Sequence, residues 1–258
     1  TRAIIAVDYA GQPCDWDALR DIAQRHKLFL VADGCHALGA EYKGRKVGSL
    51  ADLTVFSFHP VKHITTGEGG LITTHRKDLA DRMRLFRNHG IDTDFRQRET
   101  QGSWHYEMQD LGFNYRVTDM QCALGLAQLE KLPHFLERRR QIADSYHSAF
   151  SHLDKVHMQA VLEDRTHAYH LCVARITQYK DINRDVVFQR LRQRGIGVNV
   201  HYMPVHLHPY YMKRFGLGYG LCPIAEEIYQ EIISLPVWPG MTDDQTAFII
   251  EETISLMR

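Results

Sequence analysis

Lys62 is the residue whose sequence context best suits a reactive side chain. It lies between an apolar run at 53–58, which reads as a buried strand, and a glycine-rich turn at 67–70. An amine at the end of a buried strand, among small polar neighbours such as Ser57, is placed like a reactive group. Taken alone, the stretch leaves open that Lys62 is an ordinary solvated loop lysine.

Asp33 stands at the end of a second apolar run. Residues 3–7 and 28–32 read as buried strands, and a helix capped by Asp15 is predicted between them. Strand, helix and strand in this order predict a parallel crossover. Ligands of open parallel sheets bind beyond the carboxyl ends of the strands, so we expect Asp33 and Lys62 to face one crevice. A helix cap or turn is the alternative for Asp33.

The rest of the chain alternates predicted helices and strands. Helices are expected at 77–88, from a Thr118–Gln121 capping box to about 153 with a kink or restart at Pro133, from Asn183 to 194, and from a Thr242–Gln245 capping box to 257. Strands are expected at 71–74, 168–176, 198–202 and 232–235. Residues 92–104 are polar and aperiodic and predict a mobile loop.

Composition excludes several classes of protein. The chain has 258 residues, and its 31 Lys and Arg balance its 31 Asp and Glu, so no net charge draws it to nucleic acid or an anionic membrane. No apolar run approaches the roughly 20 residues that span a bilayer. We therefore expect a cytoplasmic protein without nucleic acid or membrane partners.

The cysteines and histidines do not predict a metal site. The five cysteines are spread along the chain and form no CxxC pair, which argues against disulfides and structural zinc. His206 and His208, with His201 nearby, have ligand-like spacing, but Pro204 and Pro209 indicate a loop there. We expect no bound metal.

Several motifs together resemble a known family. They are VADGCHALGA with Asp33 and His36, KVGSLADLTVFSFHPVKHITTGEGG with Lys62, and LGFNYR with Asn114. Their types and joint spacing are similar to the sugar aminotransferases of the DegT/DnrJ/EryC1/StrS family over nearly the whole chain. Within that family, HALGA, ITTGEGG and RGIGVNVHYMPVH look most like members that act in pseudaminic acid synthesis.

The resemblance implies an α/β fold of fold-type I, the class of enzymes that use pyridoxal 5′-phosphate (PLP). Residues 1–132 would be the remainder of the PLP-binding large domain with a mainly parallel sheet, and 133–258 a linking helix with a small α+β domain. Family members carry a longer N-terminal part with a phosphate loop and an aromatic residue that stacks on the cofactor. The resemblance thus implies a missing N-terminal part and a weak or inactive chain as it stands.

The same resemblance assigns roles around the cofactor ring. Lys62 would be the Schiff-base lysine that also moves a proton. Asp33 would pair with the pyridine nitrogen, and its charge would keep the ring protonated as an electron sink. His36 would lie beside the ring, with a packed structural histidine as the alternative.

Further roles concern the phosphate and the substrate. Ser57 would bind the cofactor phosphate, and Asn114 would reach that phosphate from a neighbouring subunit, which implies a homodimer with a shared active site. His201 and Tyr202 would contribute to the pocket for the nucleotide sugar.

The reaction implied is amino transfer from L-glutamate to C4 of a nucleotide-linked 4-keto-6-deoxy sugar, with UDP as the expected nucleotide. The presence of Lys62, where some family members have histidine and perform dehydration, favours transamination. A dTDP- or GDP-linked sugar, a non-catalytic remnant that only dimerises through LGFNYR, and a metal-dependent hydrolase stay open as alternatives.

Overall fold

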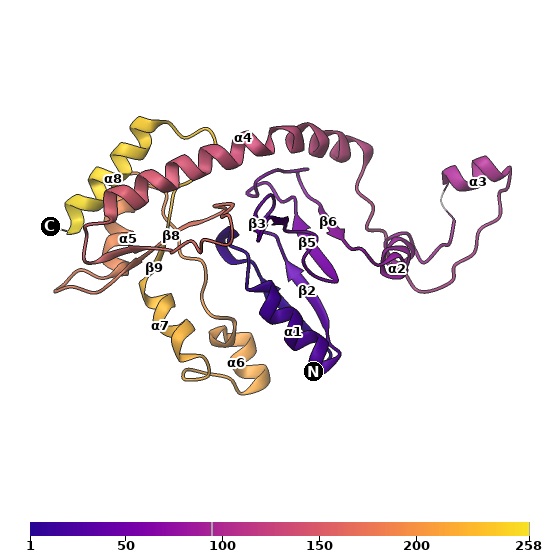
Figure 1. Cartoon of the computed structure of the whole chain (residues 1–258), viewed down its shortest axis with the longest axis horizontal. Helices are drawn as coiled ribbons and strands as arrows, with labels where there is room; N and C mark the ends of the chain where they lie inside the picture. The colour runs from indigo at the N-terminus through magenta and orange to yellow at the C-terminus, as the bar shows by residue number, and fades with distance from the viewer. Residues whose placement is uncertain (94, 258) are drawn as a thin grey trace. The chain divides into compact units, whose positions relative to one another are not determined.

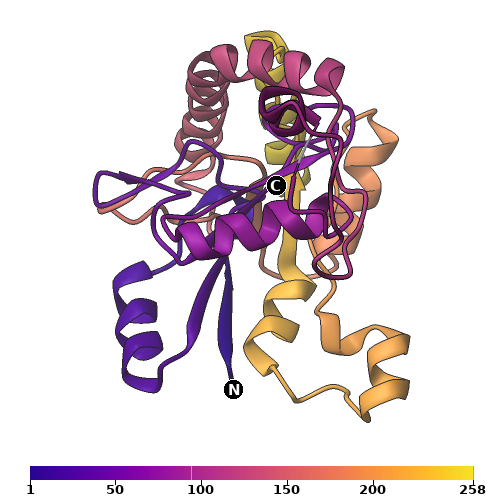
Figure 2. The same cartoon turned by 90° about the vertical axis from the view of Figure 1, so that its right-hand side faces the viewer.

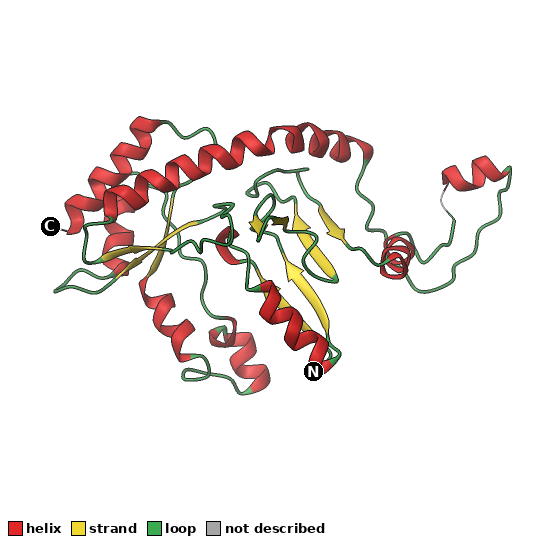
Figure 3. Ribbon diagram, viewed as in Figure 1, coloured by secondary structure: helices red, strands yellow, loops and turns green. Residues whose placement is uncertain are grey.

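The computed structural model describes residues 1–93 and 95–257, which form two compact units. The first unit comprises Thr1–Tyr9 and Pro13–Leu132, and the second comprises Ala10–Gln12 and Pro133–Arg258. Each unit contains its own sheet and helices, as Figure 1 labels them and Figure 3 colours them.

The first unit is built on a four-stranded sheet with the order β1-β2-β5-β6. Strands β1 (Ala3–Val7), β2 (Phe29–Asp33) and β5 (Leu53–Ser57) are parallel, and β6 (Gly70–Thr73) pairs antiparallel with β5. All four strands lie within one residue of their predicted bounds. The sheet is therefore mainly parallel, as expected.

Helix α1 (Trp16–His26) makes the crossover from β1 to β2, and it contacts both strands (Figure 2). The Asp15 side chain accepts the backbone N–H of Ala18 at 3.2 Å, which satisfies a donor that the first turn leaves open. Lys27 ends the helix in the left-handed conformation. The predicted cap and crossover are confirmed.

The two faces of this sheet differ in burial. Leu30, Ala32, Thr54 and Phe56 point to one face and are buried. Alternate residues point to the other face, where Ile5 is 70% exposed and Val7, Phe29 and Ile72 are also exposed. One face of the sheet thus offers apolar surface against which further protein can pack.

The part between β2 and α4 holds elements that the sequence did not reveal. A hairpin of β3 (Glu41–Tyr42) and β4 (Arg45–Lys46) follows Asp33. Helix α2 (Lys77–Arg87) is as predicted, but α3 (Phe95–Gln101) corrects the expected loop at 92–104, of which residue 94 lies outside the described residues. The sequence of α3, FRQRETQ, is rich in arginine, glutamine and glutamate, which favour helix.

Helix α4 (Asp119–Phe150) belongs to both units. The predicted capping box opens it: Gln121 N–H donates to the Thr118 hydroxyl at 3.3 Å, and Thr118 N–H donates to Gln121 Oε1 at 3.0 Å. Of the kink or restart expected at Pro133, the restart is absent, because one continuous helix of 32 residues runs through this residue. It ends at Phe150, slightly before the predicted end.

The second unit is α+β. Strands β7 (Val156–Met158), β8 (Cys172–Ile176) and β9 (Ile232–Leu235) form an antiparallel sheet. Helices α5 (Arg184–Gln193) and α8 (Asp243–Met257) pack on it, with Val187, Leu191, Ile233 and Ile249 in the buried core. The predicted caps are present: the Asn183 side chain accepts from Val186 N–H at 3.0 Å, and Thr242 accepts from Gln245 N–H at 3.2 Å.

Two strand predictions in this unit need correction. Only residues 172–176 of the expected strand at 168–176 are extended in the sheet, and the expected strand at 198–202 is a single bridge between Asn199 and Ser234. The region around His206, expected to be a loop, contains a 3-10 turn at Val205–Leu207 and helices α6 (Pro209–Phe215) and α7 (Pro223–Glu231). Proline at the first helical position lacks only an N–H that has no helical partner, so these prolines begin helices.

Three further properties hold for residues 1–93 and 95–257. None of the helices there is long and apolar enough to cross a bilayer. No group of three or more His, Cys, Asp or Glu side chains in this range could hold a metal ion. All five cysteines are free thiols.

Candidate active site

Asp33 and Ser57 lie at the carboxyl ends of neighbouring parallel strands. Asp33 closes β2 and pairs with Val55 of β5, two residues before Ser57. Because side chains alternate along a strand, Asp33, Val55 and Ser57 point to the same face. The chain then leaves the sheet in the loop 58–69, which holds Lys62.

The loop around Lys62 is closed by its own backbone. Phe58 N–H donates to Gly69 O at 2.9 Å, and Thr66 N–H donates to Phe58 O at 3.1 Å. A Cβ at position 69 would lie 2.4 Å from the Thr66 hydroxyl, so this close approach requires glycine. Ile64 is buried and anchors the loop. The backbone that carries Lys62 is thereby held in one conformation.

Helix α4 braces the same loop. The Gln121 side-chain amide donates to Glu68 O at 2.9 Å. A Cβ at Gly125 would come within 2.9 Å of the Thr66 methyl group, so the helix packs closely there. The N-terminal part of α4 therefore supports the lysine loop.

Lys62 is half-buried and lies within the electrostatic reach of Asp33 and Cys35. Burial lowers the pKa of its amine below the usual value of 10.5, and the negative charge of Asp33 opposes this shift. A lower pKa increases the fraction of neutral amine, the form that acts as a nucleophile. The structure thus brings together Lys62 and Asp33, which the sequence predicted to share one crevice.

Cys35, which the sequence analysis passed over, joins this group. Its backbone N–H donates to Asp33 Oδ1 at 3.1 Å. Burial, and then contact with the Asp33 carboxylate, raises the pKa of the thiol to about 12, so it stays neutral at pH 7. The Cys35 N–H therefore orients the Asp33 carboxylate.

Asp8 is a further acidic residue at a strand end that sequence reasoning missed. It follows β1, is fully buried, and donates its backbone N–H to Asp33 O at 3.0 Å. Its carboxylate accepts Cys14 N–H at 2.8 Å. Burial raises its pKa to about 6, against the hydrogen bond from Cys14. An acid directly after an apolar run was the available signal.

The raised pKa of Asp8 predicts a loss of stability with rising pH. Between about pH 3.8 and 6 the unfolded chain releases this proton and the folded chain keeps it, so the free energy of unfolding falls across that window. The total is about 3 kcal/mol. Asp8→Asn should flatten this slope in urea titrations from pH 4 to 7. Asp21→Asn, on the exposed side of α1, is the control, and an equal slope in Asp8→Asn and wild type would contradict the assignment.

His36 and Ser57 are close in sequence to Asp33, Cys35 and Lys62. His36 is buried, and its ring lies 6.5 Å from the ring of Tyr9 at 49°. The Ser57 hydroxyl oxygen accepts His59 N–H at 3.3 Å. Its O–H hydrogen remains available for an anion.

Asn114 lies on a different segment, before α4, and is exposed. Its backbone bridges Asn88, whose side-chain oxygen accepts from Arg116 Nη1 at 2.8 Å. Within the described ranges, no hydrogen bond joins Asn114 to Asp33, Ser57 or Lys62.

His201 and Tyr202 belong to the second unit. His201 Nδ1 lies 2.8 Å from the hydroxyl oxygen of Ser234 on β9, and the rings of His201 and Tyr202 meet edge to face at 4.8 Å. Tyr202 is exposed. The buried Ser234 side chain thus orients the His201 ring.

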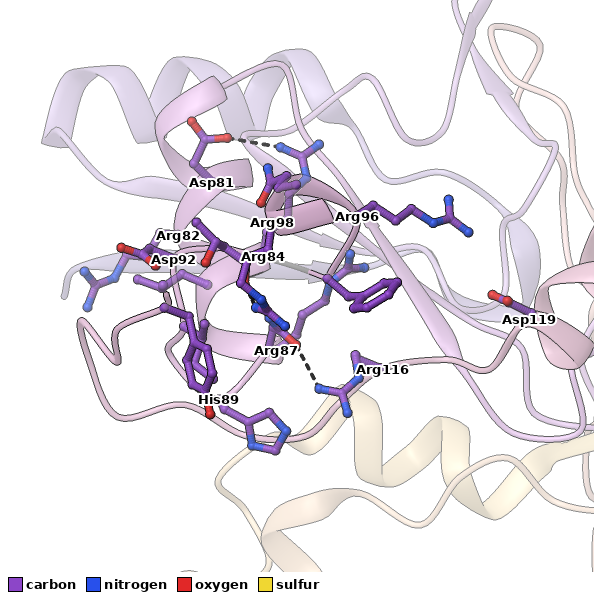
Figure 4. Close-up of a pocket in the computed structure, with 17 residues that line it drawn as sticks. Asp81, Arg82, Arg84, Arg87, His89, Asp92, Arg96, Arg98, Arg116 and Asp119 are labelled. Atoms are coloured by element: carbon purple, nitrogen blue, oxygen red, sulfur yellow. Dashed lines mark hydrogen bonds and ion pairs between the residues drawn. The ribbon is translucent and has the colours of Figure 1, made fainter. Parts of the chain in front are cut away.

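A groove elsewhere in the first unit is lined by α2, α3 and the segment before α4 (Figure 4). Its lining contains none of Asp33, Ser57 and Lys62. The chemistry predicted from the strand ends is therefore separate from this groove within one chain.

Relatives of this chain are known from several organisms. An uncharacterized protein of Methanocaldococcus jannaschii is 42% identical over 253 residues, which cover 97% of this chain and 65% of that protein. The spore coat polysaccharide biosynthesis protein SpsC of Bacillus subtilis is 38% identical and is covered over 67% of its length. The chain spans about two thirds of the length of these relatives.

Solved structures share the fold. The Helicobacter pylori aminotransferase PseC, involved in the biosynthesis of pseudaminic acid, superposes with a TM-score of 0.91 at 32% identity, covering 100% of this chain and 67% of PseC. The putative sugar aminotransferase Spr1654 of Streptococcus pneumoniae, at 31% identity, was solved in a PMP form with a TM-score of 0.91 and a PLP form with a TM-score of 0.89. This chain is fully covered in both forms and covers 69% and 68% of the two Spr1654 chains. These matches confirm the α/β fold of PLP-dependent aminotransferases.

The family described as DegT/DnrJ/EryC1/StrS aminotransferases matches residues 1–253. Together with the strand-end acids, the half-buried lysine and the shared fold, this match shows that the chain belongs to the PLP-dependent DegT/DnrJ/EryC1/StrS aminotransferase family.

Proposed function

We propose that this chain carries the catalytic centre of a PLP-dependent nucleotide-sugar aminotransferase. The observation that carries the proposal is the half-buried Lys62 amine within electrostatic reach of Asp33, at the carboxyl ends of parallel strands. Residues 1–132 act as the PLP-binding large domain, and 133–258 as a linking helix with a small domain.

The residues around Lys62 fit PLP. Lys62 supplies an amine that burial shifts toward its neutral form, Asp33 a carboxylate for a protonated pyridine nitrogen, and Ser57 a hydroxyl donor for the phosphate. His36 would lie beside the pyridine ring. When bound, PLP supplies an aldehyde for amine exchange and an electron sink.

Residues of the chain itself transfer the proton, supply the charge and position the amine. The Lys62 amine takes and returns the proton at the reacting carbon, which requires the neutral form that burial favours. Asp33, held by the Cys35 N–H, keeps its negative charge directed at the ring. The closed loop 58–69 keeps the amine in place between turnovers.

The proposed reaction moves an amino group from L-glutamate to C4 of a UDP-linked 4-keto-6-deoxy sugar. This reaction is that of a UDP-4-amino-4,6-dideoxy-N-acetyl-β-L-altrosamine transaminase, an enzyme of pseudaminic acid or related glycan synthesis. PseC and SpsC support this choice, since their names place them in pseudaminic acid and spore coat polysaccharide biosynthesis. His201 and Tyr202 contribute to the sugar-nucleotide pocket, and the reaction takes place in the cytoplasm.

A coupled assay tests the substrate. The protein is incubated with L-glutamate and a panel of UDP-, dTDP- and GDP-linked 4-keto-6-deoxy sugars, and 2-oxoglutarate formation is followed. We expect product with UDP-linked sugars. Product only with dTDP- or GDP-linked sugars would overturn the choice of nucleotide and leave aminotransfer intact.

We further propose a homodimer with a shared active site, to which Asn114 contributes from the neighbouring subunit. The support is a stretch of exposed apolar side chains on the segment before α4 and on its first half: Trp104, Tyr106, Met108, Leu111, Tyr115, Met120, Leu126 and Leu129. Apolar surface of this extent is typical of protein interfaces.

Leu126→Glu should weaken the dimer, because it places a charge in the apolar stretch. We expect the dissociation constant to rise at least about 30-fold, as for loss of an interface hot spot. Sedimentation velocity over a concentration series measures the change. Ser148→Glu, exposed on the second half of α4, is the matched control. Equal dissociation constants for the two variants would place the interface elsewhere.

A further inference from the structure

The side-chain amide of Gln121 makes hydrogen bonds in two directions. Its oxygen, Oε1, accepts the backbone N–H of Thr118 at 3.0 Å and the Thr118 hydroxyl at 2.9 Å. Its nitrogen, Nε2, donates to the backbone oxygen of Glu68 at 2.9 Å. One half-buried side chain thus joins the first turn of α4 to the loop 58–69.

The bond to Glu68 continues into the part of the loop that carries Lys62. Glu68 O also accepts the hydroxyl of Thr66 at 2.7 Å, and Thr66 is buried. Thr66 N–H in turn donates to Phe58 O at 3.1 Å, and Lys62 lies between these two residues. Three successive hydrogen bonds therefore connect the Gln121 amide with the closure of the lysine loop.

Glu68 stands in a turn whose own backbone is permissive. Its neighbours Gly67 and Gly69 have φ angles of 80° and 154°, and a Cβ at Gly67 would meet nothing within 4 Å. A glycine turn with so little packing opens easily unless it is held from outside. The donor on α4 supplies such an anchor at the residue between the two glycines.

The capping box at the start of α8 shows that capping alone does not need this bond. Thr242 N–H donates to Gln245 Oε1 at 3.0 Å, and Gln245 N–H donates to the Thr242 hydroxyl at 3.2 Å. Among the described residues, none accepts a hydrogen bond from the amide nitrogen of this exposed Gln245. The two boxes make the same cap, and Gln121 adds a contact to the lysine loop.

We propose that Gln121 is a positioning residue for Lys62: its amide nitrogen holds the loop 58–69 against α4 and so keeps the Lys62 amine half-buried. The inference rests on the proposed function, in which this amine takes and returns a proton. If the loop moves outward, the amine becomes more solvated and its pKa returns toward the usual 10.5. Gln121 thus acts through the loop on the fraction of neutral amine.

Gln121→Glu separates the two functions of the amide. Glutamate serves in a capping box as glutamine does, so α4 keeps its cap, whereas an ionised carboxylate cannot donate to Glu68 O. In the 258-residue chain without PLP, hydrogen exchange at the Phe58 and Thr66 amides should become about threefold to tenfold faster, as for loss of one hydrogen bond. Gln245→Glu makes the same change in the other capping box and should leave these rates unchanged.

Two further measurements show whether the loop acts on the amine. The pH at which Lys62 becomes reactive toward an amine-specific reagent, read by peptide mapping, should move upward in Gln121→Glu. It should also move upward in Gln121→Met, which removes the donor and adds no charge. Aminotransfer by Gln121→Glu should have a kcat about tenfold below that of wild type, with the KM for L-glutamate unchanged.

Wild-type exchange rates and Lys62 reactivity in both Gln121 variants would overturn the positioning role. Faster exchange without a shift of the Lys62 profile would overturn it too, since Gln121 would then be a structural anchor only. A shift in Gln121→Glu alone would assign the effect to the new charge and have the same consequence. Faster exchange and an upward shift in a chain that shows no Lys62-dependent change with PLP would keep the positioning role and remove the aminotransferase assignment.

Discussion

Lys62→Ala is expected to abolish the absorbance change that PLP produces on binding and to reduce aminotransfer by at least about 10³-fold. The variant removes both the amine that reacts with the cofactor and the group that moves the proton. Because Lys62 is half-buried in a loop closed by backbone hydrogen bonds, we expect the fold to tolerate alanine. Titration with PLP, followed by absorbance and circular dichroism, measures the loss.

Lys77→Ala is the matched control, since Lys77 is an exposed lysine of α2 paired with Asp81. It should behave like wild type. The same PLP-dependent absorbance in Lys62→Ala and wild type would contradict the role of Lys62 as the amine that reacts with PLP. A wild-type dimer without any Lys62-dependent band would favour the alternative of a non-catalytic dimerising protein.

Asp33→Asn is expected to lower aminotransfer by about 10²–10³-fold while PLP still binds, since it removes one preorganised charge and keeps the shape of the side chain. The variant has a second effect that needs no cofactor. Asp33 raises the pKa of Lys62, so its loss should lower that pKa further. The pH at which Lys62 becomes reactive toward an amine-specific reagent should then move downward, as peptide mapping of labelled protein can show.

Asp52→Asn is the control for this effect. Asp52 lies at the opposite, amino end of the strands, where its carboxylate accepts Leu30 N–H at 2.9 Å. It should leave the reactivity profile of Lys62 unchanged. An upward or absent shift in Asp33→Asn would contradict the proximity of the two groups.

Local signals in the sequence were sufficient for most of the elements. The caps at Asp15, Asn183, Thr118 and Thr242 were predictable because a side chain that accepts an N–H of the first turn acts within three or four residues. The strands of the first sheet were predictable because apolar runs of this length are typical of parallel strands. The expected burial of β1 was wrong, because none of its five residues is buried in the described structure. Both kinds of signal depend on neighbours in sequence.

The failures share a different cause. The expected strand at 198–202 has strand-like residues, yet only Asn199 finds a partner on β9, because pairing depends on which edge the tertiary structure offers. Helix α3 is short and polar, so no apolar periodicity marked it.

The sequence by itself determined the chemical types at the candidate site and their order: an acid at the end of β2, a hydroxyl at the end of β5, a lysine in the next loop, and the family motifs around them. Only the tertiary structure decided that Asp33 and Lys62 lie within electrostatic reach, that Cys35 N–H holds the carboxylate, and that the buried Asp8 joins them. It also showed Asn114 on a separate, exposed segment and six arginines around one groove. The physical reason is that residue identity and local periodicity are written along the chain, whereas burial and distance between groups arise only when strands pair and helices pack.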